Sequence, residues 1–271
     1  MSPGLPASPV ALAALAFGAT ATVAVLTWVA SLVRRDASLV DRTWSLMILS
    51  AASVHVALGP ASGDAALRAQ ALWLVAAAWA ARLAWFITRR NWGHGEDRRY
   101  QAIRARNQPN FALKSLVYVF LLQATLAWVV ALPAFAAALG TRPLGPWDAA
   151  GLALAAGGLV FEAVADAQMA RFRADPACRG QVMDRGLWRY SRHPNYFGEC
   201  CVWWGLGLVG LASGGGAWCL ASPLLMTVLL LKVSGVSLLE KDLVERRPAY
   251  RDYVARTNAF VPGPPRRQEA G

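Results

Sequence analysis

Charged residues are scarce in this sequence, and acidic residues are the scarcest of them. Asp, Glu, Lys and Arg make up 16% of the 271 residues, whereas hydrophobic residues make up 56%. A soluble domain has about 25% charged and about 45–50% apolar residues, so the composition argues against a water-soluble fold. The net charge of +11 would suit a nucleic-acid partner in a soluble protein. Because long uncharged segments alternate here with short Arg-rich ones, we expect basic residues held at one side of a membrane, and no nucleic-acid partner.

Metal-binding and disulfide patterns are also lacking. The four cysteines form no C-x-x-C pair, and three of them lie in or beside apolar runs, where cysteine behaves as a small hydrophobic residue. The three histidines are scattered as His55, His94 and His193, so no metal centre is predicted. The N-terminus carries no Lys or Arg before a long apolar run, which argues against a cleaved secretory signal and for a membrane span.

Seven apolar segments account for most of the chain. A membrane-spanning helix needs about 20 mostly apolar residues. The fourth segment contains Pro133, which is expected to kink that segment or break it in two. The sequence therefore predicts an all-α polytopic membrane protein in which residues 1–271 form one integral membrane domain, with a disordered tail at 263–271. The seven predicted transmembrane helices are Val10–Val33, Thr43–Leu58, Leu67–Thr88, Phe111–Leu139, Trp147–Met169, Pro194–Leu211 and Ala217–Val236.

Lys and Arg alternate between the two sides of these segments. Basic residues are dense after the first, third, fifth and seventh segments and nearly absent after the second, fourth and sixth. Positively charged loops tend to stay in the cytoplasm. We therefore expect the N-terminus outside and the C-terminus in the cytoplasm, an arrangement that requires an odd number of spans.

Two acidic residues lie inside the fifth segment. Glu162 and Asp166 are four residues apart, so they share one helical face. A carboxylate in the middle of a membrane helix costs about 2.5–3.5 kcal/mol, so it is seldom kept for packing alone. With Arg173 further along, these acids predict a polar stripe facing a cavity near the cytoplasmic side. The alternative is that Asp166 lies at the headgroup level and pairs with Arg171 or Arg173.

The segment that leads into the sixth span is the richest in ligand groups. Pro194 indicates a helix start, because proline is favoured at the first helical position. The positive end of that helix would lie beside Arg192 and His193, an arrangement suited to a phosphate. Asn195 and Glu199 follow one turn apart inside the span. The alternative is a basic juxtamembrane segment that binds lipid headgroups.

Two basic residues lie within apolar segments, Arg82 in the third and Lys232 in the seventh. A charge inside a span needs a partner, so both are candidates for the same cavity, although Lys232 can also extend to the interface. A G-x-G-x-x-G pattern begins at Gly205. Because it lies inside a span with no strand before it, it indicates helix packing and not dinucleotide binding. Together the polar residues predict a membrane enzyme with a phosphate-bearing cofactor and an apolar small-molecule substrate.

Three stretches, Phe161–Gln168, Gly186–Glu199 and Ser234–Glu240, carry a resemblance to a known family. Over residues 41–262 the chain resembles the bacterial family called domain of unknown function 1295, which is grouped with the steroid 5-alpha-reductase C-terminal domain. The resemblance implies a seven-helix protein of the bacterial inner membrane. It also implies an NADPH-dependent reductase of a C=C bond in a lipid, steroid-like or isoprenoid substrate.

The resemblance implies roles for individual residues as well. Asp166 and Arg173 match an Asp and an Arg that hold the adenosine-phosphate end of the cofactor. The reductases polarise the substrate ketone with a Glu of the second helix and a Tyr of the third, but the second segment here has no Glu, and Trp79 replaces the Tyr. A Trp cannot donate a proton in that role, so no proton donor is identified. The expected cofactor contacts are Asp166, Arg173, Tyr190, Arg192, His193, Asn195, Glu199, Lys232 and Arg251, and the substrate-cavity candidates are Arg82 and Glu162.

Two alternatives stay open at this stage. Isoprenylcysteine carboxyl methyltransferases, which use S-adenosylmethionine, carry a similar Arg-His-Pro-x-Tyr-x-Gly run. The chain fits that run at Arg192, His193, Pro194, Tyr196 and Gly198. The other alternative is a membrane protein that binds lipids and catalyses nothing.

Overall fold

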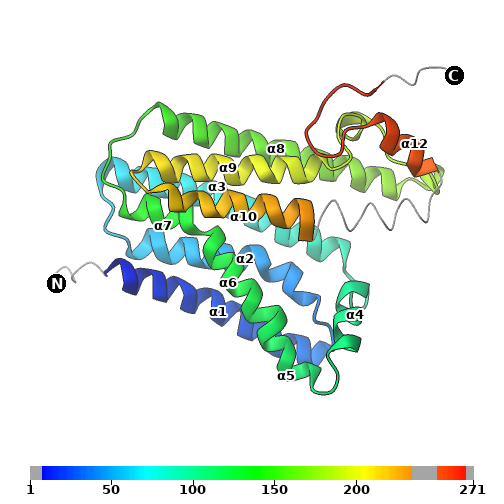
Figure 1. Ribbon diagram of the computed structural model, residues 1–271, viewed down its shortest axis with the longest axis horizontal. Helices are drawn as coiled ribbons and strands as arrows, with labels where there is room; N and C mark the ends of the chain where they lie inside the picture. Colours follow the sequence, from blue (N-terminus) through cyan, green and yellow to red (C-terminus); the bar gives the residue numbers. More distant parts are fainter. Residues whose placement is uncertain (1–7, 234–248, 267–271) are drawn as a thin grey trace. The chain divides into compact units, whose positions relative to one another are not determined.

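The computed structural model describes residues 8–233 and 249–266, and every regular element in these ranges is helical (Figure 1). The five longest elements coincide with predicted apolar segments. Their ends differ from the expected ones by up to five residues, because α8 continues from Met169 to Ala174 through polar residues. These elements are α1 (Pro9–Arg34), α2 (Leu39–Leu58), α3 (Gly63–Arg90), α8 (Pro146–Ala174) and α9 (Pro194–Ala212).

Four helical stretches of the described residues are long and apolar enough to cross a membrane: Pro9–Arg34, Gly63–Arg90, Phe111–Val130 and Pro146–Ala174. In lipid the backbone must satisfy its own hydrogen bonds, and a helix does so within one segment. These helices indicate an integral membrane protein in contact with lipid. The count of seven spans and the orientation of the termini stay predictions.

The fourth apolar segment is interrupted twice. A π-helix occupies part of its first half, which the sequence did not predict. The segment then breaks at Ala131, and Pro133 lies in the first turn of the following helix, where its missing N–H leaves no hydrogen bond unmade. The break expected from this proline is thus present. The pieces are α5 (Phe111–Ser115), η1 (Leu116–Leu121), α6 (Leu122–Val130) and α7 (Leu132–Leu139).

The remaining elements are short. Two of them, α4 (Arg98–Arg106) and α12 (Ala249–Arg256), lie in polar stretches for which no helix was predicted. The seventh apolar segment is helical up to Val233 and then leaves the described residues. Its pieces are η4 (Ala217–Leu220), α10 (Ala221–Val228) and η5 (Leu229–Val233), and the polar loop between α8 and α9 contains η2 (Pro176–Cys178) and η3 (Gly186–Arg189).

The described residues divide into two compact units. Unit 1 consists of those within Met1–Leu152 and Leu206–Ser222, and unit 2 of those within Ala153–Gly205 and Pro223–Gly271. Three helices, α8, α9 and α10, contribute residues to both units. The single integral membrane domain that the sequence predicts for the whole chain stays a prediction.

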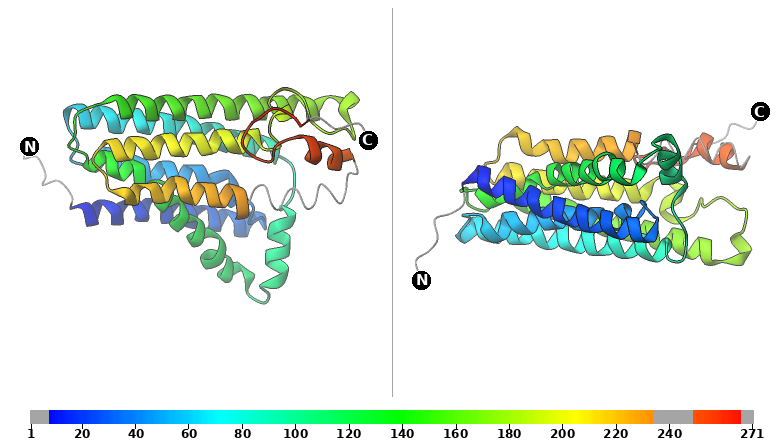
Figure 2. Two further views of the ribbon diagram at one scale, coloured as in Figure 1. Left: turned by 45° about the horizontal axis from the view of Figure 1, so that its top comes forward. Right: turned by 90° about the horizontal axis from the view of Figure 1, so that it is seen from below.

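In unit 1, α1, α2 and α3 run side by side, with α6 and α7 packed against them (Figure 2). One face of α1 carries its buried residues at intervals of three or four positions, and most of them are small. Small residues let helix backbones approach closely, which replaces the missing hydrophobic driving force in lipid. The opposite face keeps large apolar residues exposed, as expected of a lipid-facing surface. The buried face comprises Leu12, Ala16, Thr20, Ala24, Thr27 and Ser31.

A buried ion pair fastens the loop between α7 and α8 to α3. Arg68 is fully buried, and its Nε and Nη2 donate to the two carboxylate oxygens of Asp148 at 2.6 and 2.9 Å. The same guanidinium donates to the carbonyls of Arg142 and Pro143 at 2.9 and 2.8 Å. Asp148 also accepts from the backbone N–H of Gly145. This one side chain therefore holds both the middle of the loop and the start of α8.

A second polar network joins α4 to the turn between α1 and α2, to the start of α2 and to α6. Glu96 accepts from the backbone N–H of Ala37 at 2.8 Å and from Arg104 at 2.7 Å. The buried Tyr100 donates to Asp41 of α2, and Gln123 of α6 donates to the Tyr100 hydroxyl at 3.2 Å. Burial, and then the neighbouring Asp41, raise the pKa of Tyr100, so the phenol stays a donor at neutral pH. The network explains how a polar, Arg-rich segment folds as a helix here.

We expect the Glu96 contacts to make stability fall in mild acid. Burial acts to raise the pKa of Glu96, but the hydrogen bonds from Arg104 and Ala37 and the Arg104 charge outweigh it, so the pKa lies below 4.5. A carboxyl with a lowered folded-state pKa stabilises the protein fully above its unfolded-state pKa, and this contribution is lost as the pH falls through the folded value. The unfolding temperature of the wild type should therefore drop more steeply below pH 4.5 than that of Glu96→Gln. Parallel curves would show that Glu96 contributes nothing.

Candidate functional site

The site predicted from the sequence begins at a close crossing of α8 and α9 within unit 2. Two glycines meet there. A Cβ atom on Gly198 would lie 2.7 Å from the backbone nitrogen of Glu162, and one on Gly158 would lie 2.6 Å from the Gly198 carbonyl oxygen. Contacts this short to backbone atoms leave no room for any side chain. The two helices therefore touch backbone to backbone at this point.

The crossing gathers acidic and amide side chains. Gly158, Glu162 and Asp166 follow one another at four-residue intervals along α8, so they share the face that meets α9. Asn195 of α9 donates from Nδ2 to Oδ1 of Asp166 at 3.1 Å. Glu162, Asp166 and Glu199 are 2%, 5% and 6% exposed, so all three carboxyl groups are withdrawn from water. The predicted polar stripe is thus a buried interhelical cluster.

The turn before α9 is fixed against α8 by two hydrogen bonds. Gly186 has a φ of +58°, a conformation that favours glycine, and it begins η3. The side chain of Gln168 accepts from the backbone N–H of Leu187 at 2.9 Å, and the buried Trp188 indole donates to the Ala165 carbonyl at 3.0 Å. The Gly-Leu-Trp part of the motif therefore positions the chain and aims α9 at α8.

The side chain of Arg192, a residue just before α9, reaches the C-terminal end of α12. Its Nη1 donates to the carbonyls of Val254 and Thr257 at 3.0 and 2.5 Å, and its backbone N–H donates to the Asn258 carbonyl at 2.9 Å. Carbonyls at the end of a helix have no partners within the helix, and a basic side chain is a common way to satisfy them. Whatever else it does, Arg192 anchors this C-terminal helix.

Other contacts hold the chain after α12 against the motif. The Ser191 hydroxyl donates to the Phe260 carbonyl at 2.7 Å, and the buried Tyr253 hydroxyl donates to the Trp188 carbonyl. The backbone N–H of Gly263 donates to the Tyr190 carbonyl at 3.0 Å. Gly263 and Arg266, which were expected to belong to a disordered tail, are therefore tied to the fold, because the Arg266 backbone N–H also donates to the Arg256 carbonyl of α12 at 2.8 Å. Residues 267–271 lie outside the described residues.

The other predicted site residues are distributed around this cluster or away from it. His193 is buried and its ring lies parallel to that of Tyr196, with centroids 5.7 Å apart. Arg173, Tyr190, Lys232 and Arg251 also belong to unit 2, but their side chains are exposed. Arg82 lies on α3 in unit 1 and is half-buried. The Ser234–Glu240 part of the motif lies outside the described residues.

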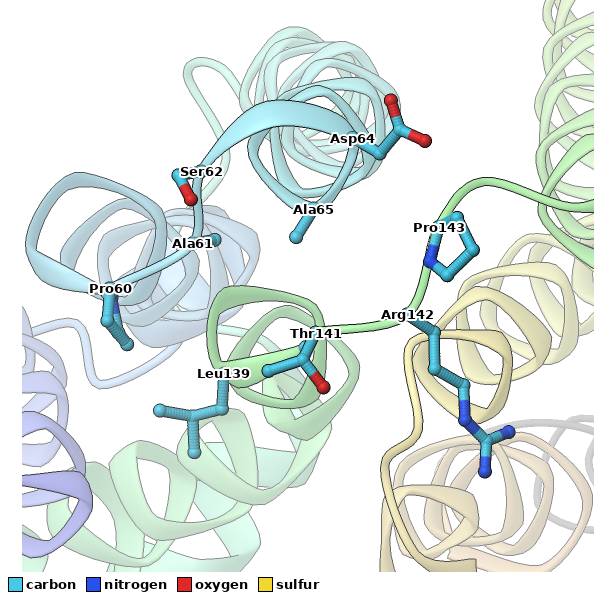
Figure 3. Close-up of a pocket in the computed structure, with 10 residues that line it drawn as sticks. Pro60, Ala61, Ser62, Asp64, Ala65, Leu139, Thr141, Arg142 and Pro143 are labelled. Atoms are coloured by element: carbon cyan, nitrogen blue, oxygen red, sulfur yellow. The ribbon is translucent and has the colours of Figure 1, made fainter.

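A separate pocket of about 430 Å³ opens in unit 1, between the α2–α3 turn and the end of α7 (Figure 3). Ser62, Asp64 and Thr141 contribute its side-chain oxygens, and Asp64 accepts from the backbone N–H of Leu144 at 3.1 Å. None of the predicted site residues lines it. Within the described part of the chain, no grouping of three or more His, Cys, Asp and Glu residues is suited to a metal ion.

The comparisons with known proteins bear on this arrangement. Residues 27–257 match the family described as "Protein of unknown function (DUF1295)". The chain belongs to the DUF1295 family. This range contains the α8–α9 crossing, the helix α12 and the turn that precedes α9. It starts before the predicted region of resemblance, 41–262, and it also stops before the end of that region. The chain is also similar to the uncharacterized protein C594.04c of Schizosaccharomyces pombe, with 26% identity over 87% of this chain and 75% of the yeast protein. No solved structure matches it.

Several residues that shape this DUF1295 site were missed by sequence reasoning. Gly158 lies on the same face of α8 as the acids, four residues before Glu162, whereas Gln168, two residues after Asp166, lies on a different face and contacts the turn before α9. Gly158 could have been identified from the sequence, because it lies one helical turn before Glu162 within a span and small residues mark helix contacts. Tyr253 had no such signal, since its partner at Trp188 is distant in the sequence.

Proposed function

We propose that this DUF1295 protein is a membrane-embedded reductase that uses NADPH to reduce a C=C bond in a lipid, steroid-like or isoprenoid substrate. The proposal includes the relation to the steroid 5-alpha-reductases, seven spans, and a C-terminus in the cytoplasm of a bacterial inner membrane. The cofactor, when bound, supplies the hydride. Asp166, Asn195 and Glu199 orient it, and the exposed Arg173, Lys232 and Arg251 neutralise its phosphates.

The hydrogen bond between Asn195 and Asp166 carries this proposal. Both residues match the reductase pattern, they come from different helices, and the half-buried Asn195 meets the buried Asp166 beside the buried Glu162 and Glu199. Buried carboxylates and amides are costly in a span unless they are hydrogen-bonded. Carboxylate oxygens accept from hydroxyl and amide N–H groups, the donors that a ribose and a nicotinamide offer. An apolar substrate would reach such a site from the lipid that surrounds the helices.

A second candidate, an S-adenosylmethionine-dependent methyltransferase of the isoprenylcysteine carboxyl type, is favoured by two other observations. The Arg192 Nη1 atom is occupied by the carbonyls of Val254 and Thr257, and not directed at a phosphate. Three buried carboxyl groups suit a cationic sulfonium better than an anionic dinucleotide, because opposite charges attract strongly where water is excluded.

Ligand-induced stabilisation separates the two candidates. A ligand present at 100 times its Kd stabilises the folded state by about 2.7 kcal/mol. We expect NADPH to raise the unfolding temperature of the purified full chain in detergent, and S-adenosylmethionine to leave it unchanged. The reverse ranking would establish the methyltransferase. A response to neither would leave only the lipid-binding protein without catalysis.

Substitutions at the crossing locate the effect. Asp166→Ala and Asn195→Ala should each abolish the NADPH response, since each removes one side of the interhelical hydrogen bond and one ligand group. Gln70→Ala, which truncates an exposed amide on α3, should retain it. Retention of the full response in both site variants would remove Asp166 and Asn195 from the cofactor site.

A further inference from the structure

One end of unit 1 presents a concentration of exposed arginines. They lie at the end of α1, at the end of α3 and on α4, which follows α3 along the chain (Figure 1). The contacts of Glu96 with Ala37 and Arg104 bring these segments together. We call these side chains the basic end surface, and it comprises Arg34, Arg35, Arg89, Arg90, Arg98 and Arg106.

The acidic residues at this end of unit 1 form their ion pairs with arginines outside the basic end surface. Arg99 pairs with Asp41 at 2.8 Å and with Asp97 at 3.1 Å. The other two acids are also taken, Glu96 by Arg104 at 2.7 Å and Asp36 by Arg42 at 3.9 Å. Three other arginines thus engage all four acids. Within the part of the chain that the structure describes, no arginine of the basic end surface forms an ion pair.

Exposed apolar side chains adjoin the arginines. Trp92, between α3 and α4, is 74% exposed, and Trp85, one turn before the end of α3, is 68% exposed. Val33 and Leu113, beside Arg34 and at the start of α5, are 80% and 67% exposed. Large exposed apolar side chains are unfavourable in water, and Trp is typical of the membrane–water interface. Charge and apolar groups therefore alternate where two candidate spans, α1 and α3, end.

We propose that the basic end surface binds the headgroups of anionic phospholipids in the leaflet at that end of the helices. Arg34, Arg35, Arg89 and Arg90 lie at the ends of α1 and α3, which are long enough to cross the membrane, and the Glu96 contacts hold α4 beside them, so lipid phosphates are within reach of all six arginines. Each basic residue near an anionic membrane surface contributes about a fivefold gain in binding. The apolar neighbours would enter the interface beside the same headgroups, which a soluble acidic partner would not accommodate. This proposal does not depend on the proposed reductase activity.

Lipid titration of the purified full chain in detergent tests the proposal. Phosphatidylglycerol is the anionic probe and phosphatidylcholine the zwitterionic one, with the unfolding temperature as the readout. The wild type should respond to phosphatidylglycerol at lower concentrations, and 0.5 M salt should weaken that preference. Arg98→Gln combined with Arg106→Gln should require about 25-fold more phosphatidylglycerol, a factor of about five for each arginine. Its response to phosphatidylcholine should not change.

The matched control removes two exposed arginines elsewhere, by Arg142→Gln combined with Arg179→Gln. This pair should keep the wild-type preference for phosphatidylglycerol. An equal loss in the control would show that only net charge matters, and a preserved preference in the Arg98 and Arg106 variant would show that the surface does not bind lipid. Either result overturns the proposal. If that variant folds poorly, Arg34→Gln combined with Arg89→Gln makes the same test on helix ends.

Discussion

Replacing Arg68 with methionine is expected to lower the free energy of unfolding by about 3–5 kcal/mol, because it leaves a buried carboxylate without its cation. Within unit 1 the Arg68 guanidinium donates two hydrogen bonds to Asp148 and one each to the carbonyls of Arg142 and Pro143. The substitution removes all of these at once. Urea or thermal unfolding in detergent, followed by circular dichroism, measures the change.

Two further variants separate the charge from the loop contacts. Arg142→Met removes a cation from the same loop, but its side chain is exposed and the change should stay within about 0.5 kcal/mol. Arg68→Met combined with Asp148→Leu removes both buried charges, so it should recover part of the loss. The recovery should be incomplete, because two carbonyls and the Gly145 N–H lose their partner. A loss in Arg68→Met no larger than in Arg142→Met would refute the role of the ion pair.

Enlarging the glycines at the α8–α9 crossing is expected to have the second large effect. In Gly158→Ala the new Cβ atom would lie 2.6 Å from the Gly198 carbonyl oxygen and 2.8 Å from the Cys201 Cβ. Neither neighbour is the flexible end of a long side chain, so the helices must move apart. Overpacking of this kind costs about 1–3 kcal/mol. Gly198→Ala should cost a similar amount, since it meets the Glu162 backbone.

The neighbouring glycine provides the control. Gly157→Ala places a Cβ where no atom lies within 4 Å, so it should stabilise the protein by about 0.5–1 kcal/mol through the better helix propensity of alanine. Gly158→Ala should also lose the cofactor response, because separating the helices breaks the Asn195–Asp166 hydrogen bond. Equal unfolding temperatures for the Gly157 and Gly158 variants would contradict a tight crossing.

Much of the helical framework was predictable from the sequence. The first predicted span, Val10–Val33, became α1, and Pro194 begins α9 as expected. An uncharged apolar segment in lipid satisfies its backbone hydrogen bonds by forming a helix, and proline marks a helix start through its own backbone. Neither effect depends on residues that are distant in the sequence. The helix α4 was missed because its residues are polar, and its formation relies on the Asp97 cap and on contacts with other helices.

The candidate site was predictable in its membership but not in its contacts. Glu162 and Asp166 share a helical face by periodicity alone, and the partner of Asp166 is an Asn that the sequence also singled out. Arg192 was interpreted as a phosphate ligand, yet its Nη1 binds the end of α12, more than 60 residues away. Side chains whose partners are remote in the sequence leave no local pattern.

Charged residues are scarce in this sequence. Their positions along the chain follow from the sequence, whereas their partners follow from the tertiary structure. By itself the sequence determined an all-helical membrane protein and the ionisable residues that lie within its apolar segments, because hydropathy and helical periodicity are local properties. Only the tertiary structure decided which charged side chains bond to other groups of the protein. Arg68 and Arg192 are engaged by buried carbonyls and a carboxylate, whereas six arginines at the ends of α1 and α3 and on α4 make no ion pair within the described residues. The reason is that a charge in or near lipid takes the nearest partner in space, and folding alone brings that partner within reach.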